Sequence, residues 1–116
     1  MNILVVDDDA TVLQVCQGML RAMNHTTVGA NDAVDAVEYL TATLQELDLV
    51  ILDHGLPGLT GMELLTVLRE WNMSIPVILI SGARPNADPD ESLTYQFLAK
   101  PFTMAELARA IEQSQQ

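Results

Sequence analysis

Polar side chains that could bind a metal ion or a phosphate follow several short apolar runs of this sequence. They are Asp7, Asp8 and Asp9 after the run that starts at Ile3, Asp53 after Leu49 to Leu52, Ser81 after Val77 to Ile80, and Lys100 after Gln96 to Ala99. Two carboxylates about 4.5 Å apart repel by roughly 3 to 4 kcal/mol at an effective dielectric constant of about 20. A site that gathers such carboxylates must take up a proton or bind a cation, and Mg²⁺ suits oxygen ligands.

Lys100 and Ser81 add the groups that a phosphate needs. Lys100 is the only lysine of the chain, and its positively charged ammonium could bind one oxygen of a phosphate. Ser81 could donate a hydrogen bond to another phosphate oxygen. In such a site a carboxylate attacks phosphorus to form an acyl phosphate. The simpler interpretation, an acidic N-cap before a helix, fits Asp9 best.

The elements that must position these residues alternate along the chain. The runs at 3–6, 49–52 and 77–80 are continuously apolar, which is typical of strands covered on both faces, and 26–28 and 96–99 are weaker strand candidates. Apolar residues recur at helical spacing over 12–23, 33–40, 62–71 and 104–111, with Asn31 placed to cap the second helix and Trp71 expected to pack on the sheet. This alternation predicts an open α/β sheet with helices on both faces, in three layers.

One connection departs from this pattern. Residues 83–94 contain Pro85 and Pro89 among several polar residues, which leaves too little uninterrupted pattern for a full crossover helix. We therefore expect a loop with one or two turns, so that the fourth helix is short or absent.

Composition narrows the class of protein. The 116 residues are expected to form one domain, 1–116, and the formal net charge of -11 argues against binding nucleic acid or an anionic membrane surface. Cys16 stands alone among apolar residues and is expected in the core, which fits a reducing compartment. With no apolar run long enough to cross a bilayer and no secretory pattern at its start, the chain is expected to be cytoplasmic.

Four motifs in register give the chain a resemblance to the receiver domains of response regulators in two-component signalling systems. They are ILVVDDD, DLVILDHGLPGLTGMELL, VILISGA and FLAKPF, and the resemblance extends over essentially the whole length. It implies a flavodoxin-like sandwich, with a five-stranded parallel sheet in the order 2-1-3-4-5 and helices on both faces.

The resemblance also implies roles for individual residues. It makes Asp53 the phosphorylated nucleophile and pairs it with a Mg²⁺ (or Mn²⁺) ion. The ion would be bound by Asp7, Asp8, Asp53 and the carbonyl of Gly55. The phosphate would be bound by Lys100, Ser81, Gly82 and, by its position, His54. Ser81 and Phe97 would form the switch that responds to phosphorylation. Pro101 would follow Lys100 through a cis peptide bond, and a lone histidine such as His54 is more often a surface residue than a catalytic one.

The implied function is to accept a phosphoryl group from a phosphohistidine and thereby switch interactions with other proteins. The donor would be a histidine kinase or a histidine phosphotransfer protein that docks near the first helix, and a homodimer is possible. The chain would be no enzyme beyond its own phosphorylation and dephosphorylation. Two alternatives stay open: a receiver-fold interaction or regulatory module of a hybrid kinase with weak or no phosphorylation, and a small metal-dependent phosphatase. Two features depart from the family, the short span from Ser81 to Lys100 and a glycine at position 55, where a side chain usually screens the acyl phosphate.

Overall fold

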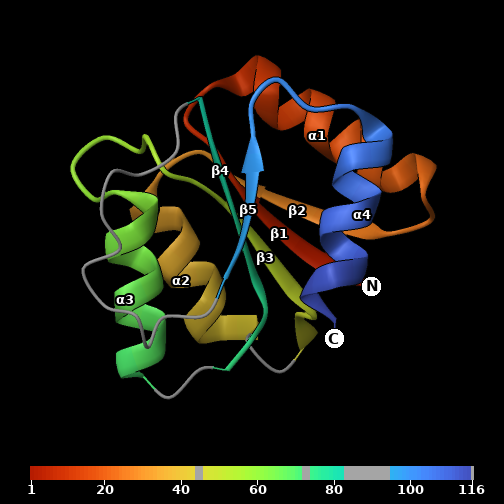
Figure 1. The fold of residues 1–116 in the computed structure, drawn as a ribbon. Coiled ribbons are helices and arrows are strands. Elements are labelled where there is room, and N and C mark those ends of the chain that lie inside the picture. Colours follow the sequence, from red (N-terminus) through yellow and green to blue (C-terminus); the bar gives the residue numbers. More distant parts are fainter. Residues whose placement is uncertain (44–45, 72–73, 83–94, 116) are drawn as a thin grey trace.

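The computed structural model describes residues 1–43, 46–71, 74–82 and 95–115, and the strands in them form one parallel sheet in the order β2-β1-β3-β4-β5 (Figure 1). The strands are β1 (Asn2–Val6), β2 (Thr26–Ala30), β3 (Leu49–Asp53), β4 (Val77–Ser81) and β5 (Gln96–Ala99). The helices are α1 (Ala10–Ala22), α2 (Ala33–Thr43), α3 (Gly61–Glu70) and α4 (Met104–Ser114). The predicted α/β sandwich and its strand order are confirmed.

Alternate residues of the central strands pack into two separate hydrophobic cores. Leu4 and Val6 of β1 belong to the core under α2 and α3, whereas Ile3 and Val5 belong to the core under α1 and α4, which also holds the buried Cys16. Because successive side chains of a strand point to opposite faces, a strand covered on both sides must be apolar throughout. This is why β1, β3 and β4 are continuous apolar runs.

One detail of the helices differs from expectation. Asp32, not Asn31, caps α2, since its Oδ1 accepts a hydrogen bond from the backbone N–H of Asp35 at 2.8 Å. Trp71 directly follows the last residue of α3 and is 44% exposed, and its packing on the sheet stays a prediction. The predicted loop at 83–94, and with it the short or absent fourth helix, lies outside the described residues. None of the described helices is long and apolar enough to cross a membrane.

Caps fix the helix starts that lie near the carboxyl ends of the strands. Asp9 caps α1, with Oδ1 accepting from the N–H of Thr11 at 2.9 Å and of Val12 at 3.3 Å, as predicted. Thr60 with Glu63, and Thr103 with Glu106, form capping boxes at α3 and α4. Each cap satisfies backbone N–H groups that would otherwise lack partners in the first turn.

Gly61 brings the start of α3 into direct contact with the end of β3. A Cβ at this position would lie 2.6 Å from the carbonyl oxygen of Asp53 and 2.9 Å from the Cα of His54. The N–H of Gly61 donates to the carbonyl of His54 at 3.1 Å. Only a residue without a side chain permits this approach, so Gly61 helps to hold the backbone on which Asp53 sits.

We expect Gly61→Ala to lower the free energy of unfolding by about 1 to 3 kcal/mol, since the added methyl group must displace backbone atoms. The matched control is Gly18→Ala in α1, where a Cβ meets nothing within 4 Å. That control should stabilise the protein by about 0.5 to 1 kcal/mol through its higher helix propensity. Urea unfolding of both variants measures the difference; equal stability would contradict the close approach.

Candidate functional site

The sheet topology brings the predicted site residues to one edge. β1 lies between β2 and β3, and Val6 of β1 is in register with Leu52 of β3. Asp7, directly after β1, is therefore next to Asp53, the last residue of β3. At this point the winding direction of the sheet reverses. Ligands of such folds bind beyond the strand ends at this position, and we call that region the crevice. Lys100 follows β5, and its backbone N–H donates to the carbonyl of Ser81 at 2.8 Å.

Three carboxylates and one ammonium meet in this crevice. One oxygen each of Asp7, Asp8 and Asp53 lie within 4.8 Å of one another. Lys100 Nζ lies 3.0 Å from Asp7 Oδ2 and 3.2 Å from Asp53 Oδ1. Asp7 is fully buried and Asp53 nearly so, whereas Asp8 is exposed. Three carboxylates and one ammonium leave two formal negative charges unbalanced, and a divalent cation with a preference for oxygen ligands fits both the charge and the donor set.

Burial and mutual charge shift the pKa values of two of these groups. Burial raises the pKa of the Asp7 carboxyl above 3.8, and the charge of Asp53 acts in the same direction, against hydrogen bonds from the Asp9 N–H and from Lys100. Burial alone would lower the pKa of Lys100, but the hydrogen bond to Asp7 and the charges of both carboxylates outweigh it and raise the pKa above 10.5. Lys100 is therefore positively charged at neutral pH.

The remaining predicted residues lie around this cluster at different depths. Ser81 is buried at the end of β4, in register with Ala99, and Gly82 is exposed directly after it. Phe97 is half-buried on β5. The peptide bond between Lys100 and Pro101 is cis, as expected.

Two residues beside Asp53 have backbone roles that can be described. The N–H of Gly55 donates to Asp53 Oδ1 at 3.2 Å. The N–H of His54 donates to the carbonyl of Ile80 at 2.8 Å, which ties β3 to β4. Within the described part of the chain, the buried Nδ1 of His54 has no hydrogen-bond partner.

No role for Gly61 was predicted from the sequence. The signal that could have indicated its close approach to β3 is the pattern T-G-x-E after a Pro-Gly turn, which marks a tight helix start.

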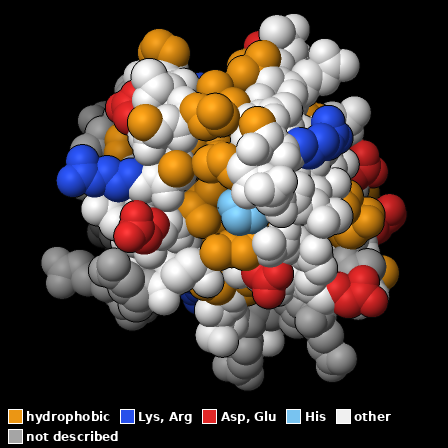
Figure 2. All heavy atoms as spheres, turned by 90° about the vertical axis from the view of Figure 1, so that its right-hand side faces the viewer, with side chains coloured by type: hydrophobic (Ala, Val, Ile, Leu, Met, Phe, Trp, Pro, Cys, Tyr) orange, Lys and Arg blue, Asp and Glu red, His pale blue; other side chains and the backbone are white. Residues whose placement is uncertain are grey.

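A hollow adjoins the cluster on the side of α1. It has a volume of about 390 Å³ and is lined mainly by α1 and by Lys100 to Phe102. Figure 2 shows hydrophobic side chains gathered on the face that α1 and α4 form. Val15 of α1 and Met104 of α4 are 52% and 44% exposed. Apolar side chains next to Lys100 are therefore exposed to solvent on this face.

Comparison with known proteins identifies the class. The model of the response regulator receiver domain family matches residues 3–112, so the chain belongs to this family and is a receiver domain of the kind found in two-component systems. The transcriptional regulatory protein PrrA of Mycobacterium tuberculosis is 33% identical over 115 residues, which cover 96% of this chain and 48% of PrrA. The chain thus spans about half the length of that relative.

Solved receiver domains share the fold. The receiver domain of the Francisella response regulator 1452 is 28% identical, with a TM-score of 0.85 over 98% of this chain and 96% of that one. The receiver domain of the hybrid histidine kinase CckA is 30% identical, with a TM-score of 0.83 over the full length of both chains. The fold is therefore found both in response regulators and in a hybrid kinase.

The raised pKa of Asp7 predicts a pH dependence of stability in metal-free buffer. The folded state binds a proton on Asp7 more tightly than the unfolded state, whose pKa is near 3.8, so this group's stabilising contribution is present below that value and is lost as pH rises through the folded pKa. We expect Asp7→Asn to gain stability relative to wild type as pH rises from about 4 to 7. Urea unfolding in EDTA measures the difference, with the exposed Glu112→Gln as control; a difference that does not change with pH would contradict it.

Proposed function

We propose that Asp53 is the acceptor of a phosphoryl group delivered by the phosphohistidine of a histidine kinase or a histidine phosphotransfer protein. The observation that supports this most is the cluster of Asp7, Asp8 and Asp53 with Lys100 at the carboxyl ends of neighbouring strands. A carboxylate held beside an ammonium, with two further carboxylates that could hold a metal ion, has the parts that phosphoryl transfer needs.

In this mechanism Asp53, Lys100 and Gly55 have different roles in a single displacement at phosphorus. A carboxylate oxygen of Asp53 forms a bond to phosphorus as the P–N bond of the donor breaks, and the departing imidazole takes a proton. Lys100, already 3.2 Å from Asp53 Oδ1, exchanges that contact for a phosphate oxygen. The N–H of Gly55, now on Asp53 Oδ1, limits the rotation of the carboxylate. The chain thereby acts only on itself and turns over no separate substrate.

A divalent ion would be held by Asp7, Asp8 and Asp53 together with the carbonyl of Gly55. When bound, Mg²⁺ or Mn²⁺ supplies positive charge to the equatorial phosphate oxygens. Asp7 is oriented for this role because its Oδ1 accepts the N–H of Asp9 at 2.9 Å, and its Oδ2 accepts from Lys100. Asp8, being exposed, can reach the ion without the cost of burying a further charge.

Residues around the crevice would bind the phosphate and would change conformation in response to it. Ser81 would donate its hydroxyl and Gly82 its backbone N–H to the phosphate, with His54 beside them. Ser81 and Phe97 sit on β4 and β5, so a shift of the Ser81 side chain toward the phosphate would leave space for Phe97 to move. That coupled movement is the switch we propose for this domain.

Partners and cell compartment follow from the same proposal. The hollow lined by α1 and Lys100 to Phe102 is the surface on which the phosphodonor would dock, because it borders Lys100, which contacts Asp53. We place the domain, residues 1–116, in the cytoplasm, where histidine kinases present their phosphohistidine, with a homodimer as a further possible output. Contact with nucleic acid or membrane is disfavoured by the net charge of -11.

We expect the protein to gain one phosphate when it is incubated with phosphoramidate or acetyl phosphate and Mg²⁺. The gain should vanish in Asp53→Asn, which removes the nucleophile. In Lys100→Gln, which removes the ammonium, the rate of phosphate incorporation should fall by a factor of about 10² or more. Intact mass spectrometry measures the gain, and Asp48→Asn is the control for loss of a carboxylate outside the cluster. No gain in folded protein would favour an interaction module, and sustained release of inorganic phosphate would favour a phosphatase.

We expect Mg²⁺ to stabilise the folded protein through the same cluster. At a concentration ten times the dissociation constant, binding adds about 1.4 kcal/mol to the free energy of unfolding. This increment should be lost in Asp8→Asn. It should persist in Asp9→Ser, since serine keeps the helix cap and Asp9 does not belong to the cluster. Thermal unfolding with and without Mg²⁺ measures both; an equal loss would indicate general charge attraction instead of a ligand.

A further inference from the structure

A second apolar hollow lies away from α1 and α4, on the other side of the sheet. It has a volume of about 460 Å³ and runs between the first half of α2 and the connection from β3 to α3. We call it the α2 groove, and the lining residues that matter here are Asp32, Val34, Val37, Glu38, Pro57 and Leu59. We propose that the α2 groove docks an amphipathic helical segment of a partner protein, whose apolar side chains are flanked by Lys or Arg.

The apolar part of the argument rests on Val34. It is 67% exposed, the largest exposed fraction among the large hydrophobic residues of the described chain. Val37 lies three positions later, on the same side of the helix, and Leu59 faces the groove from the opposite wall. A single exposed valine is ordinary, but one that forms the rim of a hollow with apolar walls is the arrangement in which a helix docks its apolar face.

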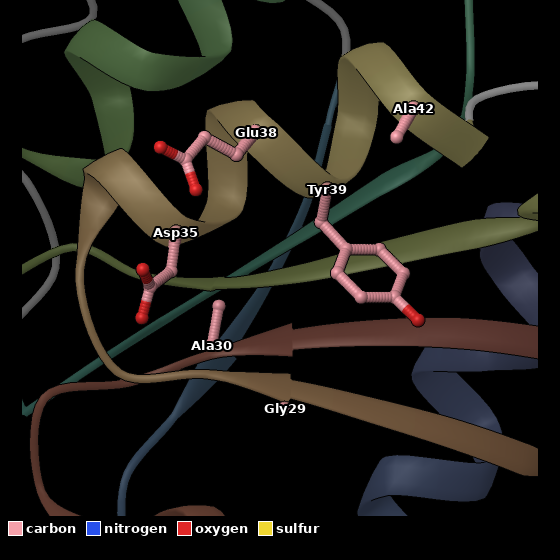
Figure 3. Close-up of a pocket in the computed structure, with 6 residues that line it drawn as sticks. All are labelled: Gly29, Ala30, Asp35, Glu38, Tyr39 and Ala42. Atoms are coloured by element: carbon pink, nitrogen blue, oxygen red, sulfur yellow. The ribbon is translucent and has the colours of Figure 1, made fainter.

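The charge around the groove selects the kind of partner. Asp32 and Glu38 line it, and Asp35 and Glu38 line a neighbouring hollow of about 390 Å³ between α2 and β2. Figure 3 shows that neighbouring hollow, with Asp35 and Tyr39 extending from α2 toward β2. In the sequence, residues 22–68 contain seven Asp or Glu and neither Lys nor Arg. A segment with basic residues beside its apolar anchors is therefore complementary in both respects.

The same charges disfavour other occupants. A second copy of this chain would set Asp32, Asp35 and Glu38 against their own counterparts, and like charges across an interface cost binding energy. Nucleic acid and anionic lipid carry negative charge as well. A basic partner segment is the occupant that the apolar walls and the acidic rim both fit.

The groove also lies close to the proposed acceptor. Pro57 to Leu59 belong to the connection between Asp53 and Gly61, so a docked segment contacts the chain that leads directly out of the acceptor site. The docking itself needs no phosphorylation, and it can be tested on the protein as it stands.

The probe is a helical peptide of about 14 residues with leucines at every third or fourth position and lysines on both flanks, compared with the same peptide carrying glutamates for lysines. Titration into the ¹⁵N-labelled protein at physiological salt maps the site by NMR. We expect saturable shifts at residues 32–38 and 57–59 with the lysine peptide alone. Val34→Gln and Glu38→Lys should each weaken binding by about fivefold or more. Both positions are exposed or on the rim, and thermal unfolding checks the fold of each variant.

Two matched controls make the result decisive. Val15→Gln removes the exposed valine of α1, and Glu112→Lys makes the same charge change on α4; both should keep binding within about twofold. The proposal is overturned if the shifts centre on Val15 and Met104, if Glu112→Lys weakens binding as much as Glu38→Lys, or if no saturation is reached. Sedimentation that shows a dimer dissociated by Val34→Gln would assign the groove to a second copy and would also overturn it.

Discussion

The ammonium of Lys100 between two buried carboxylates is the interaction on which the rest of this site depends. Asp7 is fully buried and would be costly to ionise without a cation near it. Lys100 Nζ lies within 3.2 Å of both Asp7 and Asp53, which balances part of that charge and leaves the remainder to attract a divalent ion. The cluster therefore keeps part of its negative charge, and a divalent ion bound there would balance that remainder.

The two cores hold this cluster in place. Residues of β1 and β3 alternate between the core under α2 and α3 and the core under α1 and α4. A slide by one residue would move every side chain of the strand into the opposite core and would draw a polar residue from the strand end into the apolar interior. Fixed register keeps Asp7 and Asp53 at neighbouring strand ends. Gly61 adds a backbone contact behind Asp53, and Asp9 starts α1 immediately after the acidic pair. Stability and site geometry therefore come from the same packing.

The two sides of the sandwich offer different surfaces to other proteins. The face of α1 and α4 presents an apolar hollow next to Lys100, whereas α2 presents an apolar groove with an acidic rim. One surface reaches the crevice through the residues that follow β5, and the other contacts the connection that follows β3. Two such surfaces would allow the proposed phosphodonor and a second partner protein to bind at different places on the domain.

The sequence by itself determined the strands, their polar ends and the class of chemistry. Buried parallel strands require continuous apolar runs, and parallel strands place their carboxyl ends at one edge, so the sequence alone predicts that Asp7, Asp53, Ser81 and Lys100 lie together. Only the tertiary structure decided that Lys100 pairs with Asp7 across 93 positions of the chain, that Gly61 touches the backbone of Asp53, that Asp32 caps α2, and that Val34 rims a groove. Local patterns fix which way a side chain faces along its own element. Contacts between elements depend on how the helices settle on the sheet, and no local pattern records that.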